Sequence, residues 1–197
     1  MAERPPEVVL VRHGETEWTR TRQHTGKTDL PLDDDGRSQA ELVGRALAGR
    51  EFGLVLTSPL ARARETCELA GYGDLAQARP DLAEWDYGDY EGLTTAEIRA
   101  ERPDWSLWRD GVPGGESPED VGRRADRVVA EVRAAGVDTL IFGHGHQLRV
   151  LAARWLGLAP ADGRLLVLST ASISILGYER ETAALLRWNE PVQQAAS

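Results

Sequence analysis

Two stretches of the sequence place a histidine directly after an apolar run. Residues 8–14 read VVLVRHG, so Arg12, His13 and Gly14 follow four apolar residues. Residues 138–145 read DTLIFGHG, so His144 and Gly145 follow a second such run. Imidazole can attack phosphorus, and a phosphohistidine divides one difficult displacement into two easier steps. Because the planar guanidinium of arginine binds phosphate oxygens bidentately, these residue types together indicate phosphoryl transfer.

The fold must bring the ends of both apolar runs to one place. Short runs rich in Val, Ile and Leu alternate with helical periodicity, which is typical of a mostly parallel sheet covered on both faces. In open α/β sheets, ligands bind beyond the carboxyl ends of the strands, where helix N-termini offer free N–H groups. We therefore predict a single-domain α/β fold over residues 1–197, with three α/β/α layers and a mostly parallel central sheet.

The expected elements can be placed along the chain. The predicted strands are residues 7–12, 53–57, 138–142, 165–168, 172–178 and 183–188, and the predicted helices are residues 36–49, 58–71, 116–136 and 146–157. Pro59 is expected in the first turn of its helix, and Ser117 and Asp120 have the spacing of a capping box. Residues 71–116 are rich in Gly, Pro and Trp, which indicates a small cap-like insertion.

Composition and charge exclude several classes of function. The net charge of −9 argues against nucleic-acid binding, so an anionic ligand would need a local positive pocket. No apolar run approaches the ~18 residues of a membrane span, and the N-terminus has no apolar signal core. A single cysteine, Cys67, suits a reducing cytosol, and its sequence context is that of a small core residue. We expect a cytoplasmic protein with neither nucleic acid nor membrane as a partner.

Four blocks of the sequence resemble the histidine phosphatase superfamily in its phosphoglycerate-mutase-like branch. They are LVRHGETEW, TSPLARARETCELA, LAEWDYGDYEGLT and FGHGHQLRVLAARWLG, in that order. RHG alone is a weak signal, but four blocks in the right order form a strong one, and the resemblance covers nearly the whole chain. Within the family, the chain is most similar to the small actinobacterial acid phosphatases and next to the sugar-bisphosphate phosphatases.

The resemblance implies roles for individual residues. It makes His13 the nucleophile, and it makes Arg12, Arg62 and His144 the groups that hold the transferred phosphoryl group. It matches Glu84 to the carboxylate that protonates the leaving oxygen and then activates water. The substrate-binding candidates are Thr19, Thr25, Gly26, Tyr87 and Gly145. The resemblance implies neither a metal nor a cofactor.

Two departures from the family pattern favour hydrolysis. Many relatives have asparagine where Thr19 stands, and the chain is shorter than the cofactor-dependent mutases, which must shelter the phosphoenzyme from water. We therefore predict a metal-independent phosphomonoesterase, an acid phosphatase that hydrolyses small phosphorylated metabolites through a phosphohistidine. The alternatives are a phosphoglycerate mutase, a sugar-bisphosphate phosphatase or, from another class, a phospholigand-binding module without turnover. A homodimer is common for such folds.

Other residues have ordinary structural explanations. His24 and His146 are weaker candidates than His13 and His144, and His146 is expected simply to lie on the helix that follows His144. A metallohydrolase that uses His144 and His146 is disfavoured, because no carboxylate-rich partner sequence accompanies the pair. The tryptophans of the cap-like segment are expected to serve packing rather than to form the wall of a leaving-group pocket; they are Trp85, Trp105 and Trp108.

Overall fold

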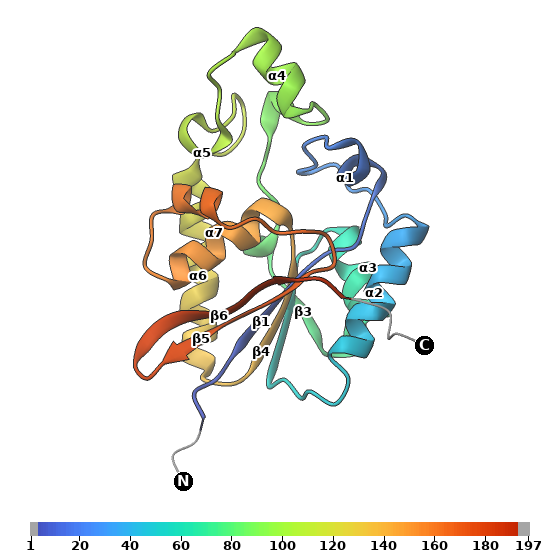
Figure 1. Cartoon of the computed structure of the whole chain (residues 1–197), viewed down its shortest axis with the longest axis vertical. Coiled ribbons are helices and arrows are strands. Elements are labelled where there is room, and N and C mark those ends of the chain that lie inside the picture. Colours follow the sequence, from blue (N-terminus) through green and yellow to red (C-terminus); the bar gives the residue numbers. More distant parts are fainter. Residues whose placement is uncertain (1–3, 193–197) are drawn as a thin grey trace.

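A six-stranded sheet forms the centre of the structure, a computed structural model that describes residues 4–192 (Figure 1). The strands are β1 (Val8–Arg12), β2 (Leu54–Thr57), β3 (Ala76–Ala78), β4 (Thr139–Gly143), β5 (Ile173–Glu179) and β6 (Thr182–Glu190). They lie in the order β3-β2-β4-β1-β5-β6. Strands β1 to β4 pair in parallel, whereas β5 is antiparallel to both β1 and β6. The prediction of a mostly parallel sheet is confirmed.

Helices cover both faces of this sheet. The α-helices of the described residues are α1 (Glu17–Thr21), α2 (Asp34–Ala46), α3 (Ala61–Leu69), α4 (Thr95–Glu101), α5 (Leu107–Asp110), α6 (Pro118–Ala135) and α7 (Gly145–Trp155). Figure 1 shows α6 and α7 on one side of the sheet and α2 and α3 on the other. The three-layer prediction is therefore confirmed, and none of the helices within residues 4–192 is long and apolar enough to cross a membrane.

The apolar run of β1 is continuous because both faces of the strand are buried. Val8 and Leu10 belong to the core cluster that contains α6 and α7 side chains, whereas Val9 and Val11 belong to the cluster on the α2 and α3 side. Successive side chains of a strand point to opposite faces, so a strand covered on both sides needs apolar residues at every position. Cys67 lies in the second cluster, where burial raises the pKa of its thiol to about 12, and its expected place in the core is confirmed.

Helices α6 and α3 test the start and stop signals that the sequence predicted. Helix α6 has the predicted capping box, in which the Ser117 hydroxyl accepts from the Asp120 N–H, and it ends at Gly136 with a φ of 62°. Helix α3 begins at Ala61, so the prediction that Pro59 lies in its first turn is wrong. Leu60 is extended, and the Ala61 N–H donates to Asp29 Oδ1 at 2.7 Å, which fixes the start of the helix two residues later.

The predicted strand at residues 165–168 is wrong. Leu165 is the last residue of a 3₁₀ helix (Pro160–Leu165), and Leu165 and Val167 are each 68% exposed. The segment instead runs past the carboxyl ends of the strands (Figure 1), where the Leu168 carbonyl accepts a hydrogen bond from Arg12. The short edge strand β3 was not predicted, because three small or polar residues carry no hydrophobic signal.

The segment expected to be cap-like divides into two parts. Strand β3 belongs to the sheet, whereas α4 and α5 lie beyond the carboxyl ends of the strands (Figure 1). Trp85 and Trp105 are almost fully buried in the core cluster, and Trp108 packs against that cluster. The preference for a packing role of these tryptophans is consistent with this placement.

Candidate active site

His13 lies directly after β1, at the carboxyl edge of the sheet. Its Nδ1 lies 2.7 Å from the carbonyl oxygen of Gly14. Because a carbonyl can only accept, Nδ1 must carry the proton, which leaves the lone pair on Nε2. Burial, together with the charges of Arg62 and Arg12, holds the pKa of His13 well below its usual value. At neutral pH this imidazole is therefore uncharged and has a nucleophilic nitrogen.

Gly14 allows close packing between the end of β1 and the start of α2. A Cβ atom at this position would lie 2.4 Å from the carbonyl oxygen of Gly36, in the first turn of α2. The Gly14 N–H also donates to the Thr66 hydroxyl at 3.1 Å, which ties the segment to α3. Helices α2 and α3 thus fix the backbone immediately after His13.

His144 occupies the equivalent position after β4 and is the N-cap of α7. The His13 and His144 ring centroids are 5.2 Å apart, which confirms that the two strand ends converge. His144 Nε2 lies 2.7 Å from the Ser58 hydroxyl, whereas Nδ1 is buried without a partner within residues 4–192. Burial and the neighbouring charge of Arg62 lower the pKa of His144 well below its usual value.

Two guanidinium groups lie near these rings, that of the half-buried Arg12 and that of the fully buried Arg62. Arg12 Nη1 donates to the Leu168 carbonyl at 2.6 Å, and Arg62 donates to the carbonyls of Thr28, Thr25 and Gly26, each at 3.0 Å. Burial lowers the pKa of both arginines, and the carboxylate of Glu84 acts in the opposite direction. The Nε atoms of both arginines are buried without a partner in the described part of the chain. Buried N–H donors are rarely left unpaired, so these atoms are suited to an oxyanion.

Glu84 lies against the N-terminus of α7. Its Oε1 accepts hydrogen bonds from the Trp85 and Gln147 N–H groups, both at 2.9 Å, and its Oε2 accepts one from the His146 N–H at 3.0 Å. The side chain belongs to a segment more than sixty residues before α7, so only the tertiary fold brings it here. A helix N-terminus favours a negative charge, which accounts for the placement of this largely buried carboxylate.

These residues surround a cavity of about 280 Å³. It is lined by Arg12, His13, Thr19, Arg22, Gln23, His24, Thr25, Glu84, Tyr87, Gly145, His146, Arg149 and Leu168. Arg62 and His144 are fully buried beside Arg12 and His13 rather than part of this lining. Among the five substrate-binding candidates, only Gly26 does not line the cavity. Its carbonyl holds Arg62, and a Cβ there would lie 2.5 Å from the Trp85 carbonyl oxygen.

Three aromatic rings form one wall of the cavity. The Tyr87 hydroxyl lies 2.5 Å from His146 Nδ1, and the His24 ring centroid lies 4.7 Å from that of Tyr87. Burial raises the pKa of Tyr87 well above its usual value and lowers the pKa of His24 to about 4. All three side chains are therefore uncharged at neutral pH, since burial also lowers the pKa of His146.

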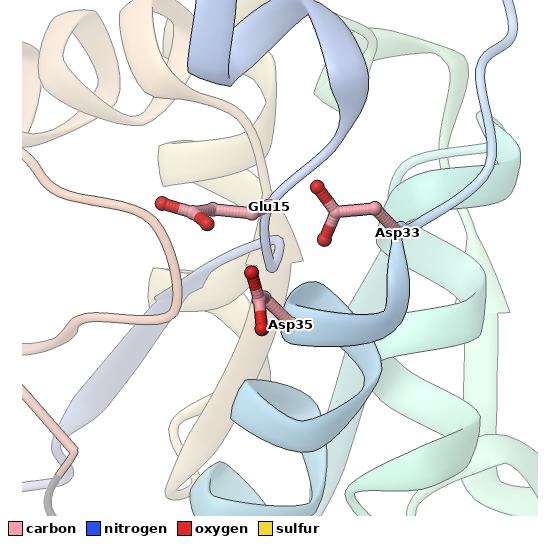
Figure 2. A group of neighbouring side chains, drawn as sticks. All are labelled: Glu15, Asp33 and Asp35. Carbon is pink, nitrogen blue, oxygen red and sulfur yellow. The ribbon is translucent and has the colours of Figure 1, made fainter.

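His144 and His146, the pair considered for a metallohydrolase, face a serine and a tyrosine. His144 Nε2 faces Ser58 and His146 Nδ1 faces Tyr87, and neither histidine belongs to a group of three or more metal-type ligands among residues 4–192. The one such group described there is Glu15, Asp33 and Asp35 (Figure 2), of which one carboxylate oxygen each lies within 4.8 Å of the others. Arg20 forms ion pairs with both aspartates.

Nearly the whole sequence matches one protein family. Residues 8–191 match the family model of the histidine phosphatase superfamily (branch 1). The chain belongs to the histidine phosphatase superfamily. The resemblance inferred from the four sequence blocks is thereby confirmed.

Relatives of this histidine phosphatase include enzymes with several activities. An acid phosphatase of Mycobacterium tuberculosis is 42% identical over 203 residues, which span the whole of both chains. A sedoheptulose 1,7-bisphosphatase of Saccharomyces cerevisiae is 37% identical, over 78% of this chain and 68% of that one. A phosphoglycerate mutase of Brucella anthropi is 36% identical, over 78% of this chain and 82% of that one.

A solved structure from Mycobacterium tuberculosis has the same fold. Its TM-score to this histidine phosphatase is 0.90 at 41% identity, and the match covers 96% of this chain and 100% of that one. Together with the family match and the phosphatase relatives, this shows that the chain is a phosphatase.

Several cavity residues of this histidine phosphatase were not predicted from its sequence. His146 does lie on the helix after His144, as expected, but it also lines the cavity. Arg149 follows His146 by three residues, so both project from one face of α7, and this spacing is a signal that could have identified them. Arg22 and Gln23 lie in a loop without a periodic pattern, and nothing local marks them.

Proposed function

We propose that this phosphatase is a metal-independent phosphomonoesterase that hydrolyses small phosphorylated metabolites through a phosphohistidine at His13. The observation that carries the proposal is the uncharged His13, with its lone pair on Nε2, beside the unpaired Nε–H groups of Arg12 and Arg62 and the unpaired Nδ1 of His144. Such a site offers a nucleophile for phosphorus and fixed positive charge for the oxygens around it.

In the first step, the Nε2 lone pair of His13 forms a bond to phosphorus, and the bond from phosphorus to the leaving oxygen breaks. Arg12, Arg62 and His144 donate hydrogen bonds to the phosphoryl oxygens, whose charge is rearranged in the transition state. A protonated Glu84 gives its proton to the leaving oxygen, which departs as an alcohol.

In the second step, a water molecule attacks the phosphohistidine. Glu84, now a carboxylate, takes a proton from that water as its oxygen bonds to phosphorus. The bond from phosphorus to Nε2 breaks, and the electron pair returns to His13. Inorganic phosphate leaves, and Glu84 is again protonated for the next turnover.

The size of the cavity supports small substrates. Its volume of about 280 Å³ is just below the range for small-molecule sites, roughly 300–1,000 Å³. By their names, two relatives act on a sugar bisphosphate and on a phosphoglycerate, which are small metabolites. We propose a cytoplasmic location as well, because such metabolites and a single buried thiol fit a reducing compartment.

His13→Ala tests the mechanism directly. We expect the variant to lose phosphate release entirely, because it removes the atom that bonds to phosphorus. Brief incubation of the wild type with ³²P-labelled substrate, followed by alkaline quenching, should leave a base-stable, acid-labile label that maps to His13. A label on a serine or aspartate, or full activity of the variant, would contradict the mechanism. Transfer of the label to a second hydroxyl instead of water would favour the mutase alternative.

A further inference from the structure

Ser58 contacts one histidine of the site and has no part in the proposed transfer of the phosphoryl group. It follows β2 directly, and its N–H donates to the Phe142 carbonyl at 3.0 Å, which holds it beside the end of β4. His144 comes two residues after Phe142, so β2 and β4 bring the serine and the histidine together. Both side chains are fully buried, and the Ser58 Oγ lies 2.7 Å from His144 Nε2.

The local sequence fixes the Ser58 hydroxyl. Its Oγ accepts a hydrogen bond from the Leu60 N–H at 3.2 Å. Pro59 has no N–H, so Leu60 is the first residue after Ser58 whose backbone can donate to this oxygen. A serine hydroxyl can also donate one hydrogen bond of its own. The contact with Leu60 leaves that hydrogen still in need of an acceptor.

His144 is the acceptor that the structure offers. Within residues 4–192, the Leu60 N–H and His144 Nε2 are the two partners of the Ser58 hydroxyl. If Nε2 carried a proton, the serine hydrogen would be buried without an acceptor, which is unfavourable. The hydrogen bonds are complete only if Ser58 donates to an unprotonated Nε2. Because His144 has a lowered pKa and is uncharged at neutral pH, its one ring proton is then on Nδ1.

Nδ1 of His144 is the ring nitrogen left for a ligand. It is buried without a partner in the described part of the chain, as are the Nε atoms of Arg12 and Arg62. The His144 ring centroid lies 5.2 Å from that of His13, the proposed nucleophile. In the opposite tautomer, a lone pair on Nδ1 would face the lone pairs of a phosphoryl oxygen, and no hydrogen bond could form.

We propose that Ser58 is a positioning residue that holds His144 in the tautomer with the proton on Nδ1, so that a neutral histidine donates to a phosphoryl oxygen. The inference rests on the proposed function, because that function places the phosphoryl group beside His13 and His144. The two histidines share one tautomer and use it differently. The Gly14 carbonyl leaves Nε2 of His13 free to attack, whereas Ser58 leaves the Nδ1–H of His144 free to donate.

Nitrogen-15 NMR of the wild-type enzyme tests the tautomer without any variant. The chain has four histidines, so labelled histidine gives four sets of ring signals. His144→Asn identifies the set of His144 by its absence. At neutral pH we expect this set to show a protonated Nδ1 and an unprotonated Nε2. A proton on Nε2 of His144 would overturn the proposal.

Ser58→Ala should release the tautomer. Without the hydroxyl, Nε2 of His144 loses its donor, and we expect the Nε2–H form, which predominates in free histidine, to become populated. The kcat for p-nitrophenyl phosphate should fall about tenfold or more, because a hydrogen bond to a charged group is lost. Orthovanadate, which resembles a phosphoryl group during transfer, should bind about tenfold more weakly in calorimetry. An unchanged tautomer or an unchanged affinity for orthovanadate contradicts the proposal.

Ser174→Ala is the matched control. Ser174 is a fully buried serine of β5 in the same sheet, and its hydroxyl also accepts from a backbone N–H, that of Asn189 at 2.9 Å. Within residues 4–192 it forms no hydrogen bond to a histidine. This variant should lower the melting temperature but keep the His144 signals and kcat. Ser58→Thr retains a hydroxyl and should retain the wild-type tautomer. Equal losses of kcat in Ser58→Ala and Ser174→Ala would overturn the positioning role.

The tautomer and the phosphoenzyme can be measured separately, which distinguishes this inference from the proposed function. A phosphohistidine on His13 in an enzyme whose His144 carries its proton on Nε2 overturns the role of Ser58 and leaves the proposed function intact. A His144 proton on Nδ1 that depends on Ser58, together with weaker binding of orthovanadate in Ser58→Ala, supports the role even if no phosphohistidine forms.

Discussion

The hydrogen bonds of the Glu84 carboxylate constrain the role of this residue. Three backbone N–H groups, those of Trp85, His146 and Gln147, donate to its two oxygens. A glutamine could not satisfy all of them, because its amide nitrogen would itself be a donor facing a donor. Substitution therefore affects both stability and proton transfer, and a test must separate the two.

Glu84→Gln should act most strongly on esters with poor leaving groups. Alkyl phosphates need a proton on the departing oxygen, whereas p-nitrophenolate departs without one. We expect phosphoenzyme formation to slow by about 10²-fold or more for an alkyl phosphate and far less for p-nitrophenyl phosphate. Burst-phase rates for both esters measure this directly. Equal losses for the two esters would exclude Glu84 as the proton donor and direct attention to Asp86 and Glu15.

Arg62→Ala should reduce catalysis much more than a surface substitution would. The guanidinium is fully buried, and its free Nε is suited to a phosphoryl oxygen. We expect kcat to fall ~10²-fold or more. The variant also leaves the carbonyls of Thr25, Gly26 and Thr28 without a donor, so its melting temperature should fall too. Arg64→Ala, on the same helix but exposed, is the control; a similar kcat for both variants would contradict the assignment.

At the residue scale, the sequence predicted five residues that the structure brings together, whereas it did not predict several residues around them. His13, Arg12, His144, Glu84 and Arg62 are close together in the structure. Arg149 and Arg22 were not predicted, because an arginine in a chain with a single lysine carries little information by itself. Only their positions in the cavity distinguish them from the many arginines that form surface ion pairs.

At the scale of the elements, the close contact between the end of β1 and the start of α2 fixes the backbone after His13. Gly14→Ala places a Cβ 2.4 Å from the Gly36 carbonyl oxygen, where backbone and not a flexible side chain must move. We expect a loss of about 1–3 kcal/mol in the free energy of unfolding and a marked loss of kcat through displacement of His13. Urea denaturation and steady-state kinetics measure the two effects.

Gly49→Ala serves as the control for that substitution. Gly49 has a φ of +79°, and a Cβ there would meet nothing within 4 Å, so the change costs backbone conformation without a clash. We expect it to lower stability by about 1 kcal/mol and to leave kcat unchanged. If Gly14→Ala also left kcat unchanged, the contact between β1 and α2 would not position the nucleophile.

In the elements that the sequence predicted correctly, the local sequence signals and the tertiary packing favour the same secondary structure. Strands β1 and β4 are apolar runs flanked by breaks, and α6 has both its capping box and its terminal Gly136. Residues 165–168 are equally apolar, but half of their side chains point to solvent, and no local signal reveals this. The position of Glu84 at the start of α7 depends on contacts across more than sixty residues, which a local pattern cannot show.

At the scale of the whole molecule, buried histidines make stability depend on pH. All four histidines, His13, His24, His144 and His146, have a pKa below the usual value of 6.5, and that of His24 is about 4. Below pH 6.5 the unfolded chain therefore binds more protons than the folded chain. The contribution of the neutral histidines to the free energy of unfolding is fully present above that pH and is lost as the pH is lowered. The slope is at most about 1.4 kcal/mol per pH unit for each histidine.

Urea denaturation at pH 7.5, 6.5, 5.5 and 4.5 measures this dependence. We expect the urea concentration at the unfolding midpoint to decrease steadily below pH 6.5. His24→Gln should make the decrease between pH 6.5 and 4 shallower by up to about 1.4 kcal/mol per pH unit. A midpoint that stays constant from pH 7.5 to 4.5 would show that the histidines are not buried in their neutral form.

The stack of Arg149 on Trp108 has an optical consequence. The Trp108 ring lies 5.3 Å from that of His146. His146 and Arg149 both line the cavity, whereas Trp108 contacts them from outside it. Indole emission is sensitive to nearby charge, and the phosphate group of a substrate bound in the cavity changes the electric field at this ring. The emission of Trp108, isolated by comparison with Trp108→Phe, thus becomes a built-in signal for occupancy of the cavity, readable in a stopped-flow instrument without any labelled ligand.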